Sequence, residues 1–182
     1  MALGKYAVDY EERVNYPRLR EERLQKAKEE LKKSEAGALI TWDEANIRYL
    51  TSYYVTTPMR PAEIHCVFLP RTGEAILVGG GSPSETERGM PWVRGRVRPS
   101  VPPVQIVADN EDHSPALIVV DAVGKLLAEY GAEKEPLAIE GTVCSMLFSR
   151  AFEKAGIKTV HGKPILDRAR MIKTQAESEL MR

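Results

Sequence analysis

The sequence predicts an α/β domain in which helices pack on a mixed sheet. Stretches with apolar residues at helical spacing alternate with short continuous apolar runs, which is the pattern of helices layered on strands. No internal repeat, low-complexity tract or long linker interrupts this alternation. The 182 residues therefore predict one domain, or one domain with an arm, because two complete cores would be cramped.

The first predicted elements are a long helix, a buried strand and a short second helix. Residues 16–33 carry an apolar stripe at helical spacing, with favourable charge pairs on the opposite side. Residues 38–41 are a short apolar run, which favours a buried strand. Asp43 stands where an N-cap belongs, and it predicts a second helix that runs through Leu50.

A hairpin and a short helix are predicted next. Residues 64–69 and 74–78 have strand composition, and a Pro-Arg-Thr-Gly turn joins them, so we expect them to pair. Ser84 with Glu87 three residues later is a capping-box pattern, and it predicts that a helix begins there.

An arginine-rich stretch follows at residues 93–103, which contain three prolines. We interpret it as an edge strand or an irregular loop. If it is extended, Arg94, Arg96 and Arg98 lie on one face at every second position. Two interpretations remain open: an edge protected from aggregation by charge, or a basic row that attracts an anionic ligand or a nucleic-acid strand.

The second half continues the alternation of helices and strands. Ser114 and Pro115 predict a helix start, and Gly131 stands where a glycine commonly ends a helix. Residues 137–139 favour a strand, and Thr142 is expected to cap the helix that follows it.

The last predicted elements are a strand at residues 157–160 and a helix at the end of the chain. Thr174 followed by Glu177 is a second capping-box pattern. The sequence stops about two turns later, so we expect Leu180 and Met181 to have few partners. We therefore expect a further domain to follow.

Composition and charge disfavour several classes of function. Lys plus Arg and Asp plus Glu both total 26, so the chain has no net positive charge that would attract nucleic acid or an anionic membrane. No apolar run approaches the roughly 20 residues that span a bilayer, and residues 1–13 lack the apolar core of a signal peptide. Cys66 and Cys144 lie far apart among apolar residues, which favours free thiols in a reducing cytoplasm. We expect a cytoplasmic protein with no nucleic-acid or membrane partner.

No pattern in the chain predicts a metal site or a catalytic residue. The histidines, which are His65, His113 and His161, are scattered and lack metal-ligand spacing. Three carboxylates fall near strand ends, as a two-magnesium nuclease would require, but Asp43 is explained as a helix cap and Glu74 as a turn residue. The third, Glu140, does not suffice alone, so nuclease chemistry is not expected.

Three segments resemble the amino-terminal domain of the creatinase/prolidase family of metallohydrolases. The first is Asp43-Glu44-Ala45-Asn46-Ile47-Arg48-Tyr49-Leu50-Thr51-Ser52-Tyr53, which is similar to the segment after that family's first strand. The second is the arginine-rich helix with Arg18-Leu19-Arg20 and Arg23. The third, Arg170-Met171-Ile172-Lys173-Thr174 followed by Glu177 and Glu179, resembles the hinge into the catalytic half. They occur in the family's order and at about its spacing.

The resemblance implies a fold and a domain division. The fold is a three-layer α/β/α domain with a mixed sheet, in a ribonuclease-H-like arrangement. Residues 1–15 would be an N-terminal arm, residues 16–168 the domain, and residues 169–182 the hinge and the start of the catalytic domain. That catalytic domain would hold two divalent metal ions, Mn, Co or Zn, with two Asp, one His and two Glu, so no cofactor is expected in this chain.

The resemblance also implies a function. The parent protein would be a hydrolase of the Xaa-Pro dipeptidase, aminopeptidase P or creatinase group that acts on a short peptide or small amide. This chain would cap the active site and contribute to a homodimer without being catalytic alone. Alternatives are creatine hydrolysis or lyase cleavage of a small sulfonium substrate by the parent, or a non-catalytic module like one in a histone chaperone.

The candidate substrate contacts lie in and beside the loop after the second helix. In the similar enzymes this loop reaches toward the active site, often that of the partner subunit. By that resemblance Tyr53 or Tyr54 would wall the substrate pocket, and Arg60 would bind a substrate carboxylate. His65 is either a further substrate contact or a packed, hydrogen-bonded strand residue. The tyrosines are alternatively surface aromatics that pack on their own domain.

Overall fold

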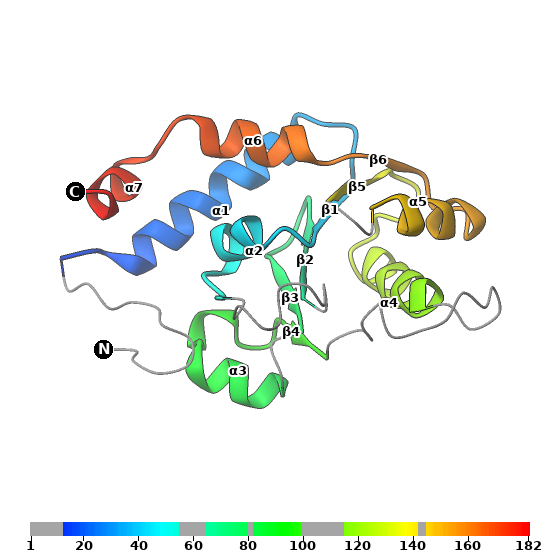
Figure 1. The fold of residues 1–182 in the computed structure, drawn as a ribbon, viewed down its shortest axis with the longest axis horizontal. Helices are drawn as coiled ribbons and strands as arrows, with labels where there is room; N and C mark the ends of the chain where they lie inside the picture. The colour runs from blue at the N-terminus through cyan, green and yellow to red at the C-terminus, as the bar shows by residue number, and fades with distance from the viewer. Residues whose placement is uncertain (1–12, 55–64, 80–81, 100–114, 142–144) are drawn as a thin grey trace.

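A computed structural model describes residues 13–54, 65–79, 82–99, 115–141 and 145–182 (Figure 1). These residues form a six-stranded sheet in the order β4-β3-β2-β1-β5-β6. The strands are β1 (Ala38–Thr41), β2 (Cys66–Pro70), β3 (Ile76–Val78), β4 (Val97–Arg98), β5 (Leu137–Glu140) and β6 (Thr159–His161). The predicted mixed sheet is therefore confirmed.

Strand β1 lies at the centre and is buried along its whole length. It pairs antiparallel with β2 and parallel with β5, so that Leu39 lies between Leu69 and Ala138. Strands β2 and β3 are antiparallel, which confirms the predicted hairpin, and β4 and β6 form the two edges. Burial on both faces explains why β1, β2 and β3 are nearly continuous apolar runs without polar alternation.

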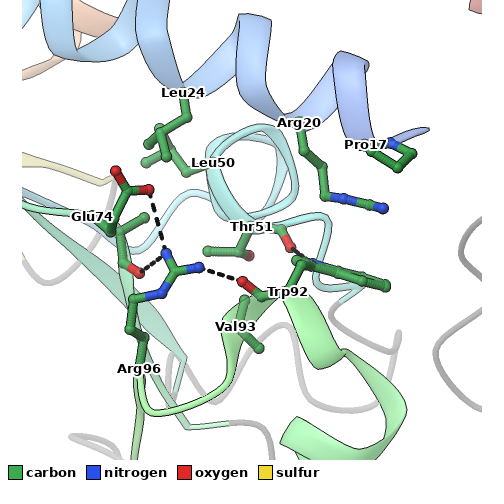
Figure 2. Close-up of a pocket in the computed structure, with 10 residues that line it drawn as sticks. Pro17, Arg20, Leu24, Leu50, Thr51, Glu74, Trp92, Val93 and Arg96 are labelled. Carbon is green, nitrogen blue, oxygen red and sulfur yellow. Dashed lines mark hydrogen bonds and ion pairs between the residues drawn. The ribbon is translucent and has the colours of Figure 1, made fainter. Parts of the chain in front are cut away.

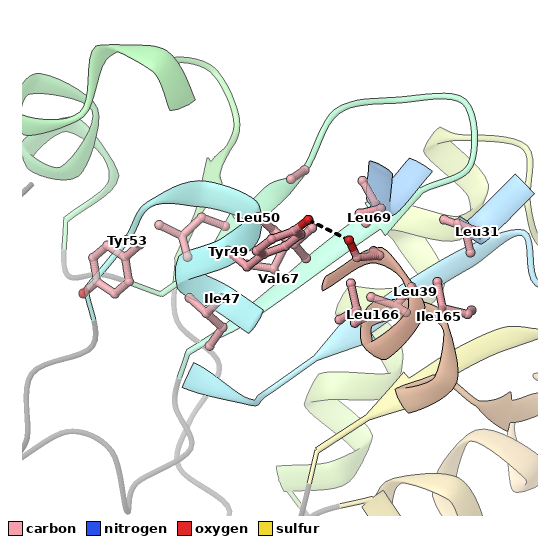
Figure 3. Packing of buried hydrophobic residues seen from close by; sticks show 14 of the residues in the cluster. Leu31, Leu39, Ile47, Tyr49, Leu50, Tyr53, Val67, Leu69, Ile165 and Leu166 are labelled. Atoms are coloured by element: carbon pink, nitrogen blue, oxygen red, sulfur yellow. Dashed lines mark hydrogen bonds between the residues drawn. The ribbon is translucent and has the colours of Figure 1, made fainter. Parts of the chain in front are cut away.

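One face of the sheet is covered by helices α1 (Tyr16–Lys32), α2 (Glu44–Thr51) and α6 (Lys163–Met171). Leu39 and Leu69 point into this layer and meet Leu166 of α6 and Leu31 of α1 (Figure 3). The Tyr49 hydroxyl donates a hydrogen bond of 3.2 Å to the carbonyl oxygen of Ala169, and this bond joins α2 to α6.

The opposite face is covered by α4 (Pro115–Glu129) and α5 (Ser145–Lys154). Ile40 and Phe68 point into this second layer and pack with Phe152. Because neighbouring strand residues point to opposite faces, Leu39 and Ile40 supply the two cores separately. The described residues therefore form the expected three-layer α/β/α domain. No helix among them is long and apolar enough to cross a membrane.

The predicted helix caps and stops are largely confirmed. The Asp43 carboxylate accepts a hydrogen bond of 2.9 Å from the backbone N–H of Asn46. Helix α4 is followed by Gly131 at φ 64°, a conformation that glycine adopts without strain. Burial raises the pKa of the Cys66 thiol to about 12, as expected of a buried free cysteine. Ser114, Thr142 and Cys144 lie outside the described residues.

The bounds of two predicted elements are corrected, and one helix was missed. Helix α3 (Pro83–Gly89) begins after Ser82, so Ser84 is not its cap, and the Glu87 carboxylate accepts from the backbone N–H of Gly95 instead. Strand β6 begins at residue 159 and not at residue 157. Helix α6 was not predicted, although its Ile165, Leu166 and Ala169 are buried at helical spacing.

The arginine-rich stretch is only partly a strand. Residues Pro91–Val93 form a short 3-10 helix, η2, and regular pairing is limited to Val97–Arg98 at the edge of the sheet. Gly95 interrupts the extended backbone at φ 76°, so the three arginines do not form one row along a strand.

Helix α7 (Gln175–Leu180) has the predicted capping box, formed by Thr174 and Glu177. The helix packs on the start of α1, where Leu180 contacts a small core with Val14 and Leu19. Leu180 therefore has more partners than its sequence predicted, whereas Met181 is 64% exposed.

Candidate functional site

Two of the predicted substrate contacts, Tyr53 and His65, form a buried pair. Tyr53 follows the end of α2, where Ser52 adopts a left-handed conformation at φ 61° and the Thr51 hydroxyl accepts from the Tyr53 backbone N–H. His65 immediately precedes β2. Their rings stack with centroids 5.3 Å apart, and the Tyr53 hydroxyl lies 3.2 Å from His65 Nε2.

Burial controls the chemistry of this pair. Tyr53 is 7% exposed and His65 is 5% exposed. The buried environment lowers the pKa of His65, because the charged imidazolium loses its hydration. Nδ1 of the ring has no hydrogen-bond partner among the described residues. The pair therefore joins the two chain segments that flank residues 55–64. The His65 imidazole in this pair is neutral.

Tyr54 lies beside this pair and is half-buried. The Arg48 guanidinium lies 5.5 Å from the centre of the Tyr54 ring, in a cation–π contact. Arg60, the remaining predicted contact, lies outside the described residues. The structure thus brings Tyr53 and His65 together and leaves Tyr54 accessible, and the substrate-binding role of all four remains a prediction.

A cavity of about 290 Å³ is lined in part by Leu50 and Thr51 at the end of α2 (Figure 2). Helix α1 contributes Arg20 to its wall, α2 contributes Thr51, the chain just before β3 contributes Glu74, and η2 contributes Trp92. The Trp92 indole N–H donates to the Thr51 carbonyl over 2.9 Å, and the Arg20 guanidinium lies 3.8 Å from the centre of a Trp92 ring. This cavity could not be predicted from the sequence, because Arg20 and Trp92 lie far apart in the chain.

The arginine-rich stretch contributes to this cavity and to the sheet edge. Arg96 lines the cavity and forms an ion pair of 3.6 Å with Glu74, and its guanidinium also donates to the backbone carbonyl of Trp92. Arg98 forms an ion pair of 3.4 Å with Glu129 of α4. Arg96 and Arg98 therefore make contacts within the domain, which agrees with the edge-strand interpretation of this stretch.

A polar cluster occupies the carboxyl ends of β1 and β5. The Thr41 hydroxyl donates to the Glu140 carboxylate, and the backbone of Trp42 bonds to the Glu140 carbonyl. Burial, together with repulsion from Asp43, raises the pKa of Glu140. Glu74 instead lies at the cavity rim, so the three carboxylates near strand ends do not converge. Among the described residues, no three His, Cys, Asp or Glu side chains gather to hold a metal ion.

The mixed sheet with a helical layer on each face defines the class, a three-layer α/β/α domain. The model of the creatinase/prolidase N-terminal domain matches residues 23–172. The chain therefore belongs to the creatinase/prolidase N-terminal domain family, as its sequence segments indicated. No curated protein matches the sequence.

Solved structures show the same fold at low sequence identity. An Xaa-Pro dipeptidase from Bacillus anthracis superposes with a TM-score of 0.58 at 14% identity, over 87% of this chain and 38% of that one. A prolidase from Thermococcus sibiricus gives 0.58 at 20% identity, over 88% and 39%. An Xaa-Pro aminopeptidase chain from Streptococcus pyogenes gives 0.57 at 16% identity, over 85% and 99%. This chain thus spans 38% of the Bacillus anthracis chain.

Proposed function

We propose that this chain is the amino-terminal domain of a hydrolase of the Xaa-Pro dipeptidase/aminopeptidase type, and that it covers the active site of a catalytic domain. The observation that supports this proposal is the family match over residues 23–172, combined with dipeptidase chains of which this chain covers only 38% and 39%. Covering an active site excludes water and fixes the size of substrate that fits.

The proposal assigns the chemical step to the catalytic domain. Two divalent metal ions, Mn, Co or Zn, would be held there and would activate a water molecule for attack on an amide carbonyl. The role of the present chain is to bind and orient a short peptide or small amide. Loss of a substrate contact in this chain should therefore change KM more than kcat.

The residues proposed to face the substrate are Tyr54 and Arg60, with Tyr53 and His65 supporting them. Tyr54 is half-buried and carries an aromatic ring, and a guanidinium at position 60 suits a substrate carboxylate. Tyr53 and His65 are buried at the two ends of the segment that carries Arg60, so they are suited to anchoring it. The proposal extends to a homodimer in the cytoplasm, in which this segment reaches the active site of the partner subunit.

The surface after α6 supports an interdomain contact. Three large apolar side chains are exposed there: Met171 at 72%, Ile172 at 75% and Met181 at 64%. These are the most exposed large apolar side chains among the described residues. Apolar surface of this kind is stabilised when another domain covers it, and we propose that the catalytic domain does so.

The experiment compares the 182-residue chain with a longer protein that contains the domain encoded after it. The chain alone should not hydrolyse an Xaa-Pro dipeptide with Mn²⁺ or Co²⁺ supplied, whereas the longer protein should. In the longer protein, Arg60→Ala and Tyr54→Ala should raise KM with little change in kcat, because they remove the proposed carboxylate contact and the proposed ring wall of the pocket. Arg94→Gln, which removes an exposed arginine elsewhere, serves as the control and should leave both constants unchanged.

Two results would overturn the proposal. The first is hydrolysis by the 182-residue chain in proportion to its concentration. The second is a following domain that lacks the two Asp, one His and two Glu of the expected metal site, which would instead favour a non-catalytic binding module.

A further inference from the structure

We propose that Glu22 and Arg23 of α1 are positioning residues that lock α7 onto this domain and so fix the direction in which the chain leaves it. A joint with the domain expected after residue 182 would then lie beyond α7 and not between α6 and α7. The rigidity of α7 is a property of the present chain alone. Its consequence for catalysis rests on the proposed function.

Helix α7 has a small apolar contact with α1. Ala176 is nearly fully buried against Val14 and Leu19, and Leu180 packs at the edge of the same small core. A helix of six residues is marginal without tertiary contacts. Because the apolar contact is small, we expect the position of α7 to depend also on the polar bonds that join it to α1.

The Arg23–Glu177 ion pair is central among these bonds. Arg23 Nε lies 3.0 Å from Glu177 Oε1, and the two side chains are 18% and 5% exposed. Oε2 of the same carboxylate accepts from the backbone N–H of Thr174 over 3.1 Å. The Arg23 guanidinium also lies 5.3 Å from the centre of the Tyr49 ring. Solvent screens so protected a pair weakly, and loss of one partner leaves the other charge without this compensation.

Glu22 holds the first turn of α7 at a second point. Its carboxylate accepts from the backbone N–H of Ala176 over 3.3 Å, and that N–H lies in the turn where a helix has no partners of its own. A hydrogen bond to the Thr174 side chain is the largest cause of the lowered pKa of Glu22. Arg18 Nε, 2.6 Å from Glu22, keeps the carboxylate in place, and the same guanidinium donates to the Gln175 side chain over 3.2 Å.

The chain between α6 and α7 is fixed as well. The Lys26 ammonium of α1 donates to the carbonyl oxygen of Ile172. At the end of α6 the Arg170 guanidinium donates to Asn46 Oδ1 of α2 over 2.7 Å. The connection is thus bonded to α1 and α2 before, within and after its extended part. A joint between two moving domains requires fewer such bonds.

A fixed exit direction has a consequence under the proposed function. The proposed substrate contacts lie in this domain, and the metal ions would lie in the next one. Their separation is reproducible only if the connection between the domains is rigid, and small errors in position are costly to catalysis. Release of α7 should therefore weaken substrate binding, although Glu22 and Arg23 act through α7 and not on the substrate.

The first test is hydrogen exchange of the α7 amides, followed by NMR in the 182-residue chain. In the unaltered chain this exchange should be at least about a hundredfold slower than in an unstructured chain. Glu177→Gln keeps a side-chain oxygen for the Thr174 N–H, because glutamine also serves in a capping box, but removes the charge that pairs with Arg23. It should speed exchange in α7 at least about tenfold and leave α6 unchanged.

The matched control is Glu179→Gln, the same substitution on the same helix. Glu179 is half-buried, and its carboxylate accepts from the Gln175 side chain over 3.1 Å. This substitution should speed exchange in α7 less than about threefold, because a bond between partly exposed side chains contributes little.

The second test uses the longer protein that contains the following domain. Glu177→Gln should raise KM for an Xaa-Pro dipeptide at least about threefold with little change in kcat, and Glu179→Gln should leave KM unchanged. Partial unfolding alone would lower the amount of active enzyme, and with it the apparent kcat, without changing KM. The rise in KM therefore separates positioning from a loss of stability.

Four results would overturn the proposal or its basis. Unprotected α7 amides in the unaltered chain, or exchange in Glu177→Gln no faster than in Glu179→Gln, would overturn the lock. Release of α7 without a rise in KM would overturn its positioning role. An inactive longer protein would overturn the proposed function and the catalytic consequence with it, whereas exchange in the 182-residue chain would still decide whether the lock exists. The measurement on the unaltered chain remains decisive even if a variant does not fold.

Discussion

The Tyr53–His65 pair allows a quantitative test by a double-mutant cycle of Tyr53→Phe and His65→Phe. Both rings are buried and stacked, and the Tyr53 hydroxyl lies 3.2 Å from His65 Nε2. Tyr53→Phe keeps the ring and removes this hydrogen bond. The imidazole, whose Nδ1 already has no partner among the described residues, then loses the partner of its second nitrogen.

The expected magnitudes follow from the cost of an unsatisfied buried polar group. Tyr53→Phe should lower the free energy of unfolding by about 1–3 kcal/mol. For a chain of 182 residues, that loss corresponds to a fall in Tm of roughly 2–4 °C for each kcal/mol. His65→Phe should also destabilise, because the Tyr53 hydroxyl then faces an apolar ring. The double variant replaces both polar partners by apolar groups, so it should be less destabilised than the sum of the single variants.

The assay is urea unfolding of the four proteins at pH 8, where His65 is neutral in all states that contain it. We expect a coupling energy of at least about 1 kcal/mol. The pairing is refuted if the effects of the two single variants add up to the effect of the double variant within about 0.3–0.5 kcal/mol. As a control, Arg94→Gln changes an exposed side chain outside the pair and should change stability by less than about 0.5 kcal/mol.

Three further changes test other parts of the fold. Leu166→Ala removes a fully buried side chain between α6 and the sheet and should cost about 2–5 kcal/mol in urea unfolding; a smaller loss would mean that α6 does not pack there. Thr174→Ala breaks the capping box and should cost about 1 kcal/mol, seen as faster hydrogen exchange within α7 but not within α6. Glu140→Gln should stabilise the chain at pH 8 and have little effect near pH 4.5. A larger stabilisation near pH 4.5 than at pH 8 would contradict the raised pKa of Glu140.

Features set by local interactions could be predicted from the sequence. Asp43 and Thr174 accept backbone bonds three residues ahead, and Gly131 takes a left-handed conformation after its helix. Each depends on a few adjacent residues, so the sequence contains all the information required. The hairpin of β2 and β3 was predictable for the same reason, because its turn lies between two apolar runs.

Features that depend on packing were mispredicted or missed. Helix α6 has three buried apolar positions, and these pack on α1 and on the sheet, contacts that the sequence does not show. Ser84 has the capping pattern, but the chain enters α3 through Pro83, which can occupy a first helical position where a backbone N–H is not needed. The helix therefore begins earlier than the pattern predicted.

The candidate sites show the same division. The likeness to the family selected Tyr53, and His65 was a candidate as a histidine at the start of a predicted strand, but only the fold shows that the two contact each other. Trp92 lies near the arginine-rich stretch in the sequence, whereas its partner Arg20 lies on α1, far away in the sequence. Contacts between distant segments are fixed by the order of strands in the sheet, and one sequence contains no direct signal for that order.

The pH dependence at Glu140 must be measured on single variants, because His65 acts in the opposite direction. The raised pKa of Glu140 gives stability that is fully present below its ordinary value of 4.5 and is lost as pH rises through the folded-state pKa. The lowered pKa of His65 gives stability that is present above 6.5 and is lost as pH falls through the folded-state pKa. In the unaltered chain these two pH dependences of stability offset each other. A free energy of unfolding that does not change with pH there contradicts neither pKa shift. Glu140→Gln should expose the loss of stability that His65 causes as the pH falls below 6.5, and His65→Phe should expose the loss that Glu140 causes as the pH rises above 4.5.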